Sequence, residues 1–263
     1  MSTYSDEHQI FLKRRRKRKY LIIFSQVVII IAFLTIWQLC ASFGLINTFM
    51  SSSPKDIFST IFNLAKANQL SSHILVTLYE TLISFSIAGI VGLIIATILW
   101  WYPFSAKVFD PYLTIINSLP KVALGPLIII WVGASINSII FMALMISLII
   151  TVINIYNGFI STDQDYITLL KSFNASKKQM FLTLILPSNR VNIINSLKIN
   201  ISMSLIGVIM GELLVSKQGL GYLIMYGSQV FNINLVITSV VILGLMSYLM
   251  YYIINFIEKR LNK

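Results

Sequence analysis

Four charged side chains interrupt long apolar stretches of the sequence, and these are the first candidates for chemistry: Glu80, Lys121, Lys198 and Glu212. A charge in such a stretch is energetically costly, so it often lies on a route for a polar solute or bonds to a neighbouring helix. Lys198 and Glu212 would lie about 21 Å apart along one helix and cannot pair directly. Asn195 and Asn200 extend the set. We interpret all six as either lining a route, where the basic members would suit an anion, or linking helices.

No group of side chains has the spacing of an enzyme or metal site. The two histidines, His8 and His73, lie far apart, and Cys40 is the single cysteine, so neither a His-based triad nor an intrachain disulfide is expected. The phosphate-binding pattern GxxxxGK[ST] is absent from the sequence. We therefore predict no catalytic residue, no metal and no cofactor in this chain.

The composition places these residues in a membrane. Apolar residues make up 57% of the chain, the mean hydropathy is +0.82, and only 11% of residues are charged, against about 25% in soluble domains. A spanning helix needs roughly 20 apolar residues. We predict an all-α, multi-pass protein of the cell membrane with one membrane domain over residues 20–257. Its six spans are expected near residues 20–43, 75–101, 111–132, 136–158, 191–215 and 235–257.

The distribution of basic residues predicts the orientation. Residues 13–19 read KRRRKRK directly before the first span. With that end in the cytoplasm, fifteen Lys and Arg lie on the inner side and three on the outer side, as the positive-inside rule requires. Both termini are thus expected inside, with cytoplasmic tails at 1–19 and 258–263. The net charge of +11 then suits a lipid bilayer and requires no nucleic-acid partner.

A polar segment at 163–190 runs directly into the fifth span. Such a direct connection is what a membrane helix would require if it is moved by a soluble motor protein. We predict two short helices in it, at 164–173 and 176–185. Asn174 lies at the break, because Asn tolerates the left-handed conformation that ends a helix. Pro187 is expected to begin a new element, since proline cannot continue the helix before it. The alternative is a basic loop that lies on anionic lipid.

This segment resembles the cytoplasmic loop of ATP-binding-cassette (ABC) importer permeases, whose pattern is EAA-x3-G-x9-I-x-LP. Aligned on Leu186-Pro187, the EAA triplet is replaced by Thr168-Leu169-Leu170 and the glycine by Asn174. Ala175-Ser176 match the common GAS sequence, and Leu184 occupies the isoleucine position.

Three further segments carry the same resemblance, so that it covers roughly residues 54–257. SLPKVALGPLIIIWVG at 118–133 resembles the third span of permeases for nitrate, sulfonate, taurine and thiamine precursors. The segment at 73–96 resembles their second span, although Glu80 stands about where they have a basic residue. GELL with GLG, at 211–221, resembles the end of their fifth span.

The resemblance implies a MetI-like permease fold and an importer of several subunits. The loop at 163–190 would form a coupling helix in a cleft of a separate ABC ATPase subunit, which binds ATP and Mg. Closure of two such subunits would drive alternating access. A second permease copy, as a homodimer, and an external solute-binding protein or lipoprotein are further implied partners. The solute would be a small organic anion or a heterocycle, such as a sulfonate or a thiamine precursor.

Two other classes of function stay open on the residues alone. A membrane enzyme would need polar catalytic groups gathered at one membrane face. A scaffold without a transport role would leave the coupling loop unexplained.

Glycine and proline positions predict local structure. Gly207 and Gly211 form a GxxxG pair, which permits close helix approach within the subunit or between two copies. Pro120 is expected to kink the third span. Pro103 and Pro111 are expected to bracket an inner turn at 102–110, and Ser53 to begin a surface helix in the outer segment 44–74.

Overall fold

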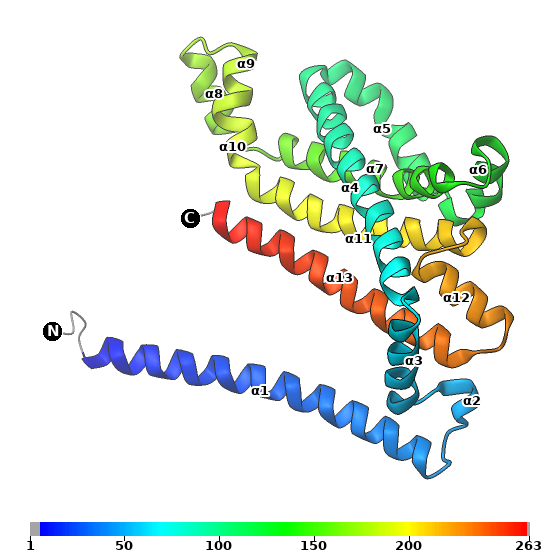
Figure 1. Cartoon of the computed structure of the whole chain (residues 1–263). Coiled ribbons are helices and arrows are strands. Elements are labelled where there is room, and N and C mark those ends of the chain that lie inside the picture. Colours follow the sequence, from blue (N-terminus) through cyan, green and yellow to red (C-terminus); the bar gives the residue numbers. More distant parts are fainter. Residues whose placement is uncertain (1–5, 262–263) are drawn as a thin grey trace.

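The computed structural model describes residues 6–261, and every regular element in that range is helical (Figure 1). The extreme ends of the two predicted tails, residues 1–5 and 262–263, lie outside this range. The long helices are α1 (Asp6–Ser42), α4 (Gln69–Trp101), α7 (Ile136–Ile160), α11 (Arg190–Val215) and α13 (Ile233–Leu261). The shorter ones are α2 (Thr48–Ser51), α3 (Pro54–Lys66), α5 (Pro103–Ser118), α6 (Gly125–Val132), α8 (Gln164–Ser172), α9 (Lys177–Met180), α10 (Leu186–Ser188) and α12 (Leu220–Gln229).

The five long helices are each apolar and long enough to cross a membrane. A sixth crossing is formed if α5 and the segment Lys121–Val132 are counted together, although the two are bent by 82°. The prediction of an all-α membrane fold with six spans is thus confirmed, with the third span broken rather than straight.

The bend in the third span follows from Pro120. Proline has no N–H to continue the helix, and its ring pushes the preceding residue out of the helical region. Leu119 accordingly adopts an extended conformation, with φ −63° and ψ 140°. The expected turn at 102–110 is wrong, because a helix resumes at Pro103 and runs through Pro111. Pro103 is well tolerated because it lies in the first helical turn, where its missing N–H has no partner to lose, whereas Pro111 lies inside the helix.

The core of the bundle is built by α4, α7 and α11. Gly207 and Gly211 of α11 lie against α7, where a Cβ atom on Gly207 would overlap the Cα atom of Ala143. A Cβ atom on Gly211 would lie 2.9 Å from the Cα atom of Ile139. The GxxxG pair therefore lies at a close helix crossing within the subunit.

A second apolar cluster joins α12 and α13 to α3 and α4. Leu220 and Leu223 of α12 are buried against Met246 and its neighbours on α13. The first residues of α3 are ordered by Ser53, whose hydroxyl accepts a hydrogen bond from the Asp56 N–H at 3.2 Å. The helix start predicted at Ser53 is thus present.

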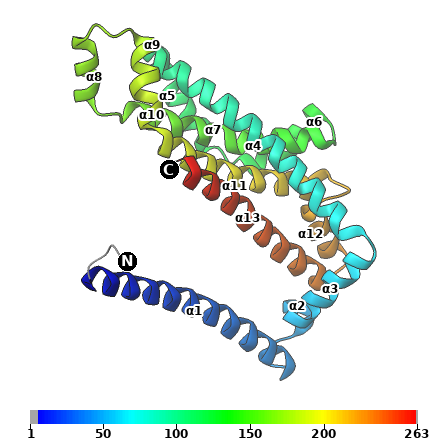
Figure 2. The same ribbon diagram turned by 60° about the vertical axis from the view of Figure 1, so that its left-hand side comes forward.

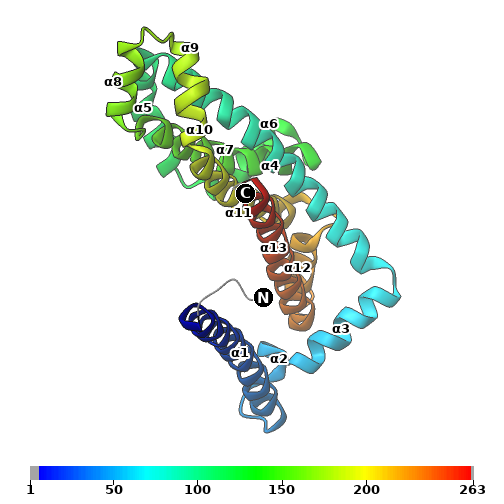
Figure 3. The same cartoon turned by 90° about the vertical axis from the view of Figure 1, so that its left-hand side faces the viewer.

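Helix α1 stands apart from this bundle (Figure 3) and is joined to it through α2 and α3. No residue of its apolar stretch is buried. The N–H of Lys55 donates to the Oε1 atom of Gln38 at 3.1 Å, which fixes the end of α1 to the start of α3.

Candidate functional site

The polar segment after α7 folds into a helical hairpin that projects from one end of the bundle (Figures 1 and 2). Its first helix, α8, ends in a Schellman motif, in which Asn174 is left-handed with φ 55°. The N–H of Ala175 donates to the carbonyl of Leu170 at 3.0 Å, and that of Asn174 to the carbonyl of Lys171 at 2.9 Å. The break predicted at Asn174 is therefore present.

The second helix of the hairpin begins with a capping box. The Ser176 hydroxyl accepts from the N–H of Gln179 at 3.3 Å, and the Gln179 side chain accepts from the N–H of Ser176 at 2.8 Å. Between the two helices the chain presents Phe173, 73% exposed, with Ala175 beside it half-buried. The hairpin thus has a short tip that is fixed by local hydrogen bonds and exposed.

Aromatic side chains anchor the hairpin to the bundle. Phe181 lies between Trp100 at the end of α4, with ring centroids 5.2 Å apart, and Phe159 at the end of α7, 5.7 Å away. The Lys177 ammonium donates to the carbonyl of Trp101 and lies 5.6 Å from the centroid of the Trp100 ring. The second helix of the hairpin and the turn after it are thus packed on the ends of α4 and α7.

A short separate element, α10, begins at the Leu186–Pro187 step. Residues Phe181–Ile185 form a π-helical turn, and the N–H of Leu186 donates to the carbonyl of Phe181. This wider turn removes the clash that proline causes in an α-helix. The new element expected at Pro187 is thus present as α10, which begins one residue earlier, at Leu186, and connects α9 to the start of α11. There, Asn189 donates to the Thr162 hydroxyl at 2.8 Å.

The other positions of the predicted coupling loop differ in exposure. Thr168 and Leu169 are exposed on α8, whereas Leu170 is half-buried. Leu184, Leu186 and Pro187 are half-buried where the hairpin meets the bundle. The loop thus has an exposed tip and a base that packs on the transmembrane helices.

At the opposite end of the bundle, three side chains bind three consecutive backbone N–H groups at the start of α12. The Gly219 N–H donates to Nδ1 of His73 at 3.0 Å, and the Leu220 N–H to Oγ1 of Thr77 at 2.8 Å. The Gly221 N–H donates to Oε2 of Glu212 at 2.6 Å. These N–H groups have no partner within α12 itself.

The same residues also bond to one another, so we name His73, Thr77, Glu212 and residues 219–221 the α12 latch. Thr77 donates to the Oε1 atom of Glu212 at 2.6 Å, which joins α4 to α11. Gly219 has φ +108°, and a Cβ atom on Gly219 would overlap the Glu212 carboxyl group. Only glycine fits this turn, and the carboxylate lies at a helix N-terminus, where negative charge is stabilised.

Glu80 lies one turn further along α4 and is 2% exposed. Its carboxyl group interacts directly with that of Glu212, itself 1% exposed, across the α4–α11 contact. The Oε2 atom of Glu80 has no hydrogen-bond partner among the described residues.

The remaining intramembrane candidates are held in different ways. Lys198 donates to Oε2 of Glu258 on α13 at 2.6 Å. Lys121 donates to the Asn117 carbonyl oxygen at 3.1 Å, across the bend of the third span. Both lysines therefore bond to groups within the subunit.

The two amides differ. Asn200 is buried and donates from Nδ2 to the carbonyl of Phe85 at 3.0 Å, which links α11 to α4. Asn195 is exposed on α11. The six polar positions therefore do not form one continuous lining within the subunit.

Sequence reasoning missed His73 and Thr77 as members of a site. The signal was available, because His73, Thr77, Glu80 and Ser84 recur every three or four residues and so share one face of a helix. Within residues 10–260, whose side chains the structure describes, no three His, Cys, Asp or Glu side chains are grouped as they would be to hold a metal ion.

This chain is similar in sequence and in fold to known transport proteins. A family model described as "Binding-protein-dependent transport system inner membrane component" matches residues 88–263. A probable ABC transporter permease protein of Haemophilus influenzae is 29% identical over 89% of this chain and 95% of its own length. A putative aliphatic sulfonates transport permease of Escherichia coli is 24% identical over 83% of each chain.

Two more similarities concern transport proteins. A formylaminopyrimidine transport permease of Halalkalibacterium halodurans is 26% identical over 72% of this chain and 75% of its own length. Among solved structures, an inward-facing methionine ABC transporter matches with a TM-score of 0.61 at 18% identity, over 72% of this chain and 94% of the other.

Proposed function

The chain belongs to the family of binding-protein-dependent transport system inner membrane components, and we propose that it is the permease subunit of an ABC importer that moves a small solute by alternating access. It is a multi-pass protein of the cell membrane. Hydrolysis of ATP, with Mg, is assigned to separate ATPase subunits, and this chain contributes no catalytic group. The observation that carries the proposal is the exposed hairpin α8–α9, anchored by Phe181 to the ends of α4 and α7.

The hairpin tip is the proposed contact with the ATPase. Phe173 would enter an apolar pocket of the partner, because a large exposed aromatic side chain on a rigid turn is a typical interface anchor. Ala175 beside it permits close approach of the ATPase to the hairpin, and Lys171 and Lys178 would lie at the rim of this contact. The lysine at 177 has a different task, since it bonds to the end of α4.

The orientation follows from this assignment and from the basic residues. The hairpin, and with it both termini, would lie in the cytoplasm, and the α12 latch would lie toward the outside. Reporter fusions at Lys263 and near Ser52 test this, and signals from the same side would contradict the six-span topology.

The solute and the other partners are inferred from relatives. Relatives named for aliphatic sulfonates, taurine and formylaminopyrimidine indicate a small organic anion or a heterocycle. A second copy of this chain would complete the pathway as a homodimer, and an external solute-binding protein or lipoprotein would deliver the solute. No nucleic acid is required.

The proposal is tested at Ala175. A glutamate there places a charge in a packed interface, where an unpaired ion costs several kcal/mol. We expect Ala175→Glu to insert and fold but to lose the ATPase in a pull-down and to abolish uptake. Phe173→Ala should weaken both, by about 3 kcal/mol at most.

The matched control is Thr183→Glu, which adds the same charge at an exposed position of the same segment, away from the tip. Its hydroxyl bonds only to the carbonyl of Gln179 within the helix. If Ala175→Glu retains the ATPase as firmly as Thr183→Glu and transports normally, the hairpin is not the coupling element. A membrane enzyme or a scaffold would retain no ATPase in any variant.

A further inference from the structure

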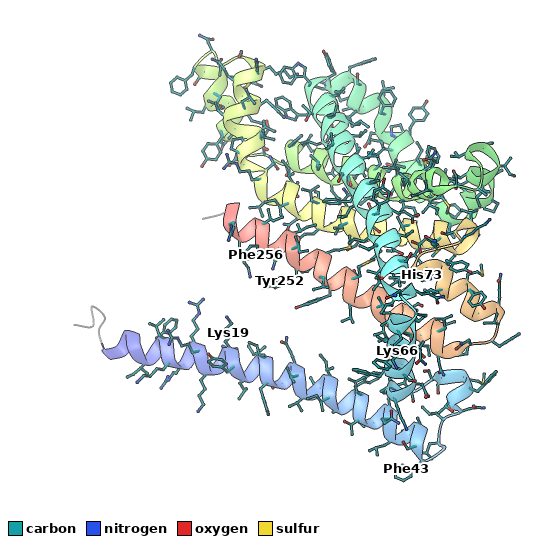
Figure 4. All side chains as sticks on the ribbon, in the orientation of Figure 1. Lys19, Phe43, Lys66, His73, Tyr252 and Phe256 are labelled. Atoms are coloured by element: carbon teal, nitrogen blue, oxygen red, sulfur yellow. The ribbon has the colours of Figure 1, made fainter. Side chains whose placement is uncertain are left out.

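A cavity of about 850 Å³ opens beside the α12 latch, at the end of the bundle opposite the hairpin. Its walls come from the end of α3, the first turns of α4, the loop at 216–219, α12 and the start of α13. Figure 4 shows His73 where α4 crosses the start of α12, with Lys66 at the end of α3 below it. The cavity has the size of a small-molecule site.

The polar side chains of this cavity are amides, hydroxyls, one imidazole and one ammonium, all of which can donate hydrogen bonds. Lys217 supplies the only charge in the lining, and no Asp or Glu lines the cavity. Asn63, Gln69 and Asn232 add amide groups. Because Nδ1 of His73 accepts from the Gly219 N–H, the proton of the neutral ring is on Nε2, which makes that atom a donor. A ligand that offers oxygen acceptors and negative charge matches this set.

One wall of the cavity is aromatic. The ring of Tyr222 is stacked on that of His73, with centroids 5.9 Å apart, and Tyr226 is stacked on Tyr222 at 6.0 Å. Leu223 and Leu235 also line the cavity and are buried. This wall would contact the carbon part of a ligand while the donors hold its polar head.

We propose that this cavity is a binding site for a small organic oxyanion, such as an alkanesulfonate, on its way into the permease. The inference rests on the proposed transport function and narrows its solute class. A cationic or strongly basic heterocycle fits less well, because the cavity has no acidic side chain to pair with it. Lys217 is the residue expected to select for charge.

The cavity is connected to the rest of the subunit through the loop before α12. Lys217 and Gln218 line it, and the next three residues, 219–221, belong to the α12 latch. A ligand in the cavity would therefore contact a loop that is hydrogen-bonded to α4 and α11.

The experiment uses a reporter thiol in the complete permease–ATPase complex in nanodiscs, where both faces are accessible. Cys40 is the single cysteine and is replaced by serine. Ser72→Cys then places a thiol at an exposed position that lines the cavity. Its modification is timed with an anionic sulfonatoethyl methanethiosulfonate and with the cationic trimethylammonioethyl reagent. Each rate is divided by that of a small free thiol.

We expect the anionic reagent to react on the order of tenfold faster than the cationic one, because a local cation raises the concentration of anions. Lys217→Gln should abolish this preference. Lys55→Gln, which removes an exposed lysine at the same end but outside the cavity, should keep it. Ethanesulfonate should protect the thiol in the parent and not in Lys217→Gln. Equal protection by propionate would extend the oxyanion site to carboxylates.

Equal normalised rates for the two reagents, or a preference unchanged by Lys217→Gln, would overturn the inference. Retention of the ATPase is measured on the same samples. A complex that retains its ATPase but shows no anion preference removes the cavity site and leaves the permease function standing. Failure to retain the ATPase in the parent contradicts the permease function itself.

Discussion

Among small side-chain changes, loss of the Thr77 hydroxyl is expected to weaken the hydrogen bonds of the α12 latch the most. Oγ1 of Thr77 donates to Glu212 at 2.6 Å and accepts from the Leu220 N–H at 2.8 Å. Valine has the same shape and makes neither bond. The Leu220 N–H would then be buried without a partner, which costs about 1–3 kcal/mol, and the carboxyl group would lose a strong donor. We expect Thr77→Val to lower the free energy of unfolding by about 2–4 kcal/mol.

The matched control is Thr97→Val on the same helix. The hydroxyl of Thr97 bonds only to the carbonyl of Leu93, one turn earlier. Its loss should cost well under 1 kcal/mol, because hydrogen bonds inside membrane proteins average about 0.6 kcal/mol. Tryptophan fluorescence during heating of the purified complex in nanodiscs gives an apparent Tm for each variant. The expected fall is roughly 4–16 °C for Thr77→Val, at about 2–4 °C per kcal/mol for a chain of this size.

A third variant separates the hydroxyl from the shape of the side chain. Thr77→Ser keeps the oxygen and should stay close to the parent in Tm. If Thr77→Val lowers Tm no more than Thr97→Val does, the three side chains do not hold the start of α12, and its order must come from apolar packing alone.

Three other changes probe the remaining contacts. Gly207→Ala should lower the stability by about 1–3 kcal/mol, because its Cβ atom meets the backbone of α7, whereas Gly244→Ala, with no atom within 4 Å, should leave Tm unchanged or slightly higher. Lys198→Met should lower the free energy of unfolding by about 1–3 kcal/mol, because it leaves Glu258 unpaired. Adding Glu258→Leu should restore Tm. Uptake by the double variant then shows whether the lysine also contacts the solute. Asn174→Val should lose about 1–2 kcal/mol and weaken ATPase retention, since a branched side chain opposes a left-handed residue, whereas Asn174→Gly should retain both.

Features that depend on a few adjacent residues could be predicted from the sequence. Asn174 ends a helix in a left-handed conformation and Ser53 begins one, because the bonds that fix them lie within about five residues. The apolar runs gave the spans for the same reason, since hydropathy is a sum over neighbouring positions.

Features that depend on a balance between local costs were predicted less well. Pro120 and Pro187 both remove an N–H from a helix, yet the first lies at an 82° break within a span, whereas the second follows a π-helical turn. At Pro187 the preceding turn widens into a π-helix, and the segment is held on both sides, by Phe181 against α4 and by Asn189 against Thr162. That support comes from distant residues and has no trace in the local pattern.

The α12 latch could be half predicted. The sequence shows Glu212 as a charge in an apolar stretch, without indicating its partner, and the GLG sequence follows shortly after it. The partner, Thr77, is 135 residues away in the sequence. A single sequence gives the polar face of α4 and the glycine turn separately, but only the packing of α4 on α11 brings them into register.

The two ends of the subunit are connected by one continuous element. Helix α11 runs without a break over 26 residues, about 39 Å at the usual rise per residue. At its start Asn189 bonds to Thr162 beside the hairpin, and near its end Glu212 bonds to the first residues of α12. A helix of this length tilts or rotates as a body far more readily than it compresses. We therefore expect a displacement of the hairpin by the proposed ATPase to reach the loop that carries Lys217. A solute bound at that loop would then, by reciprocity, change the free energy of the hairpin's arrangement.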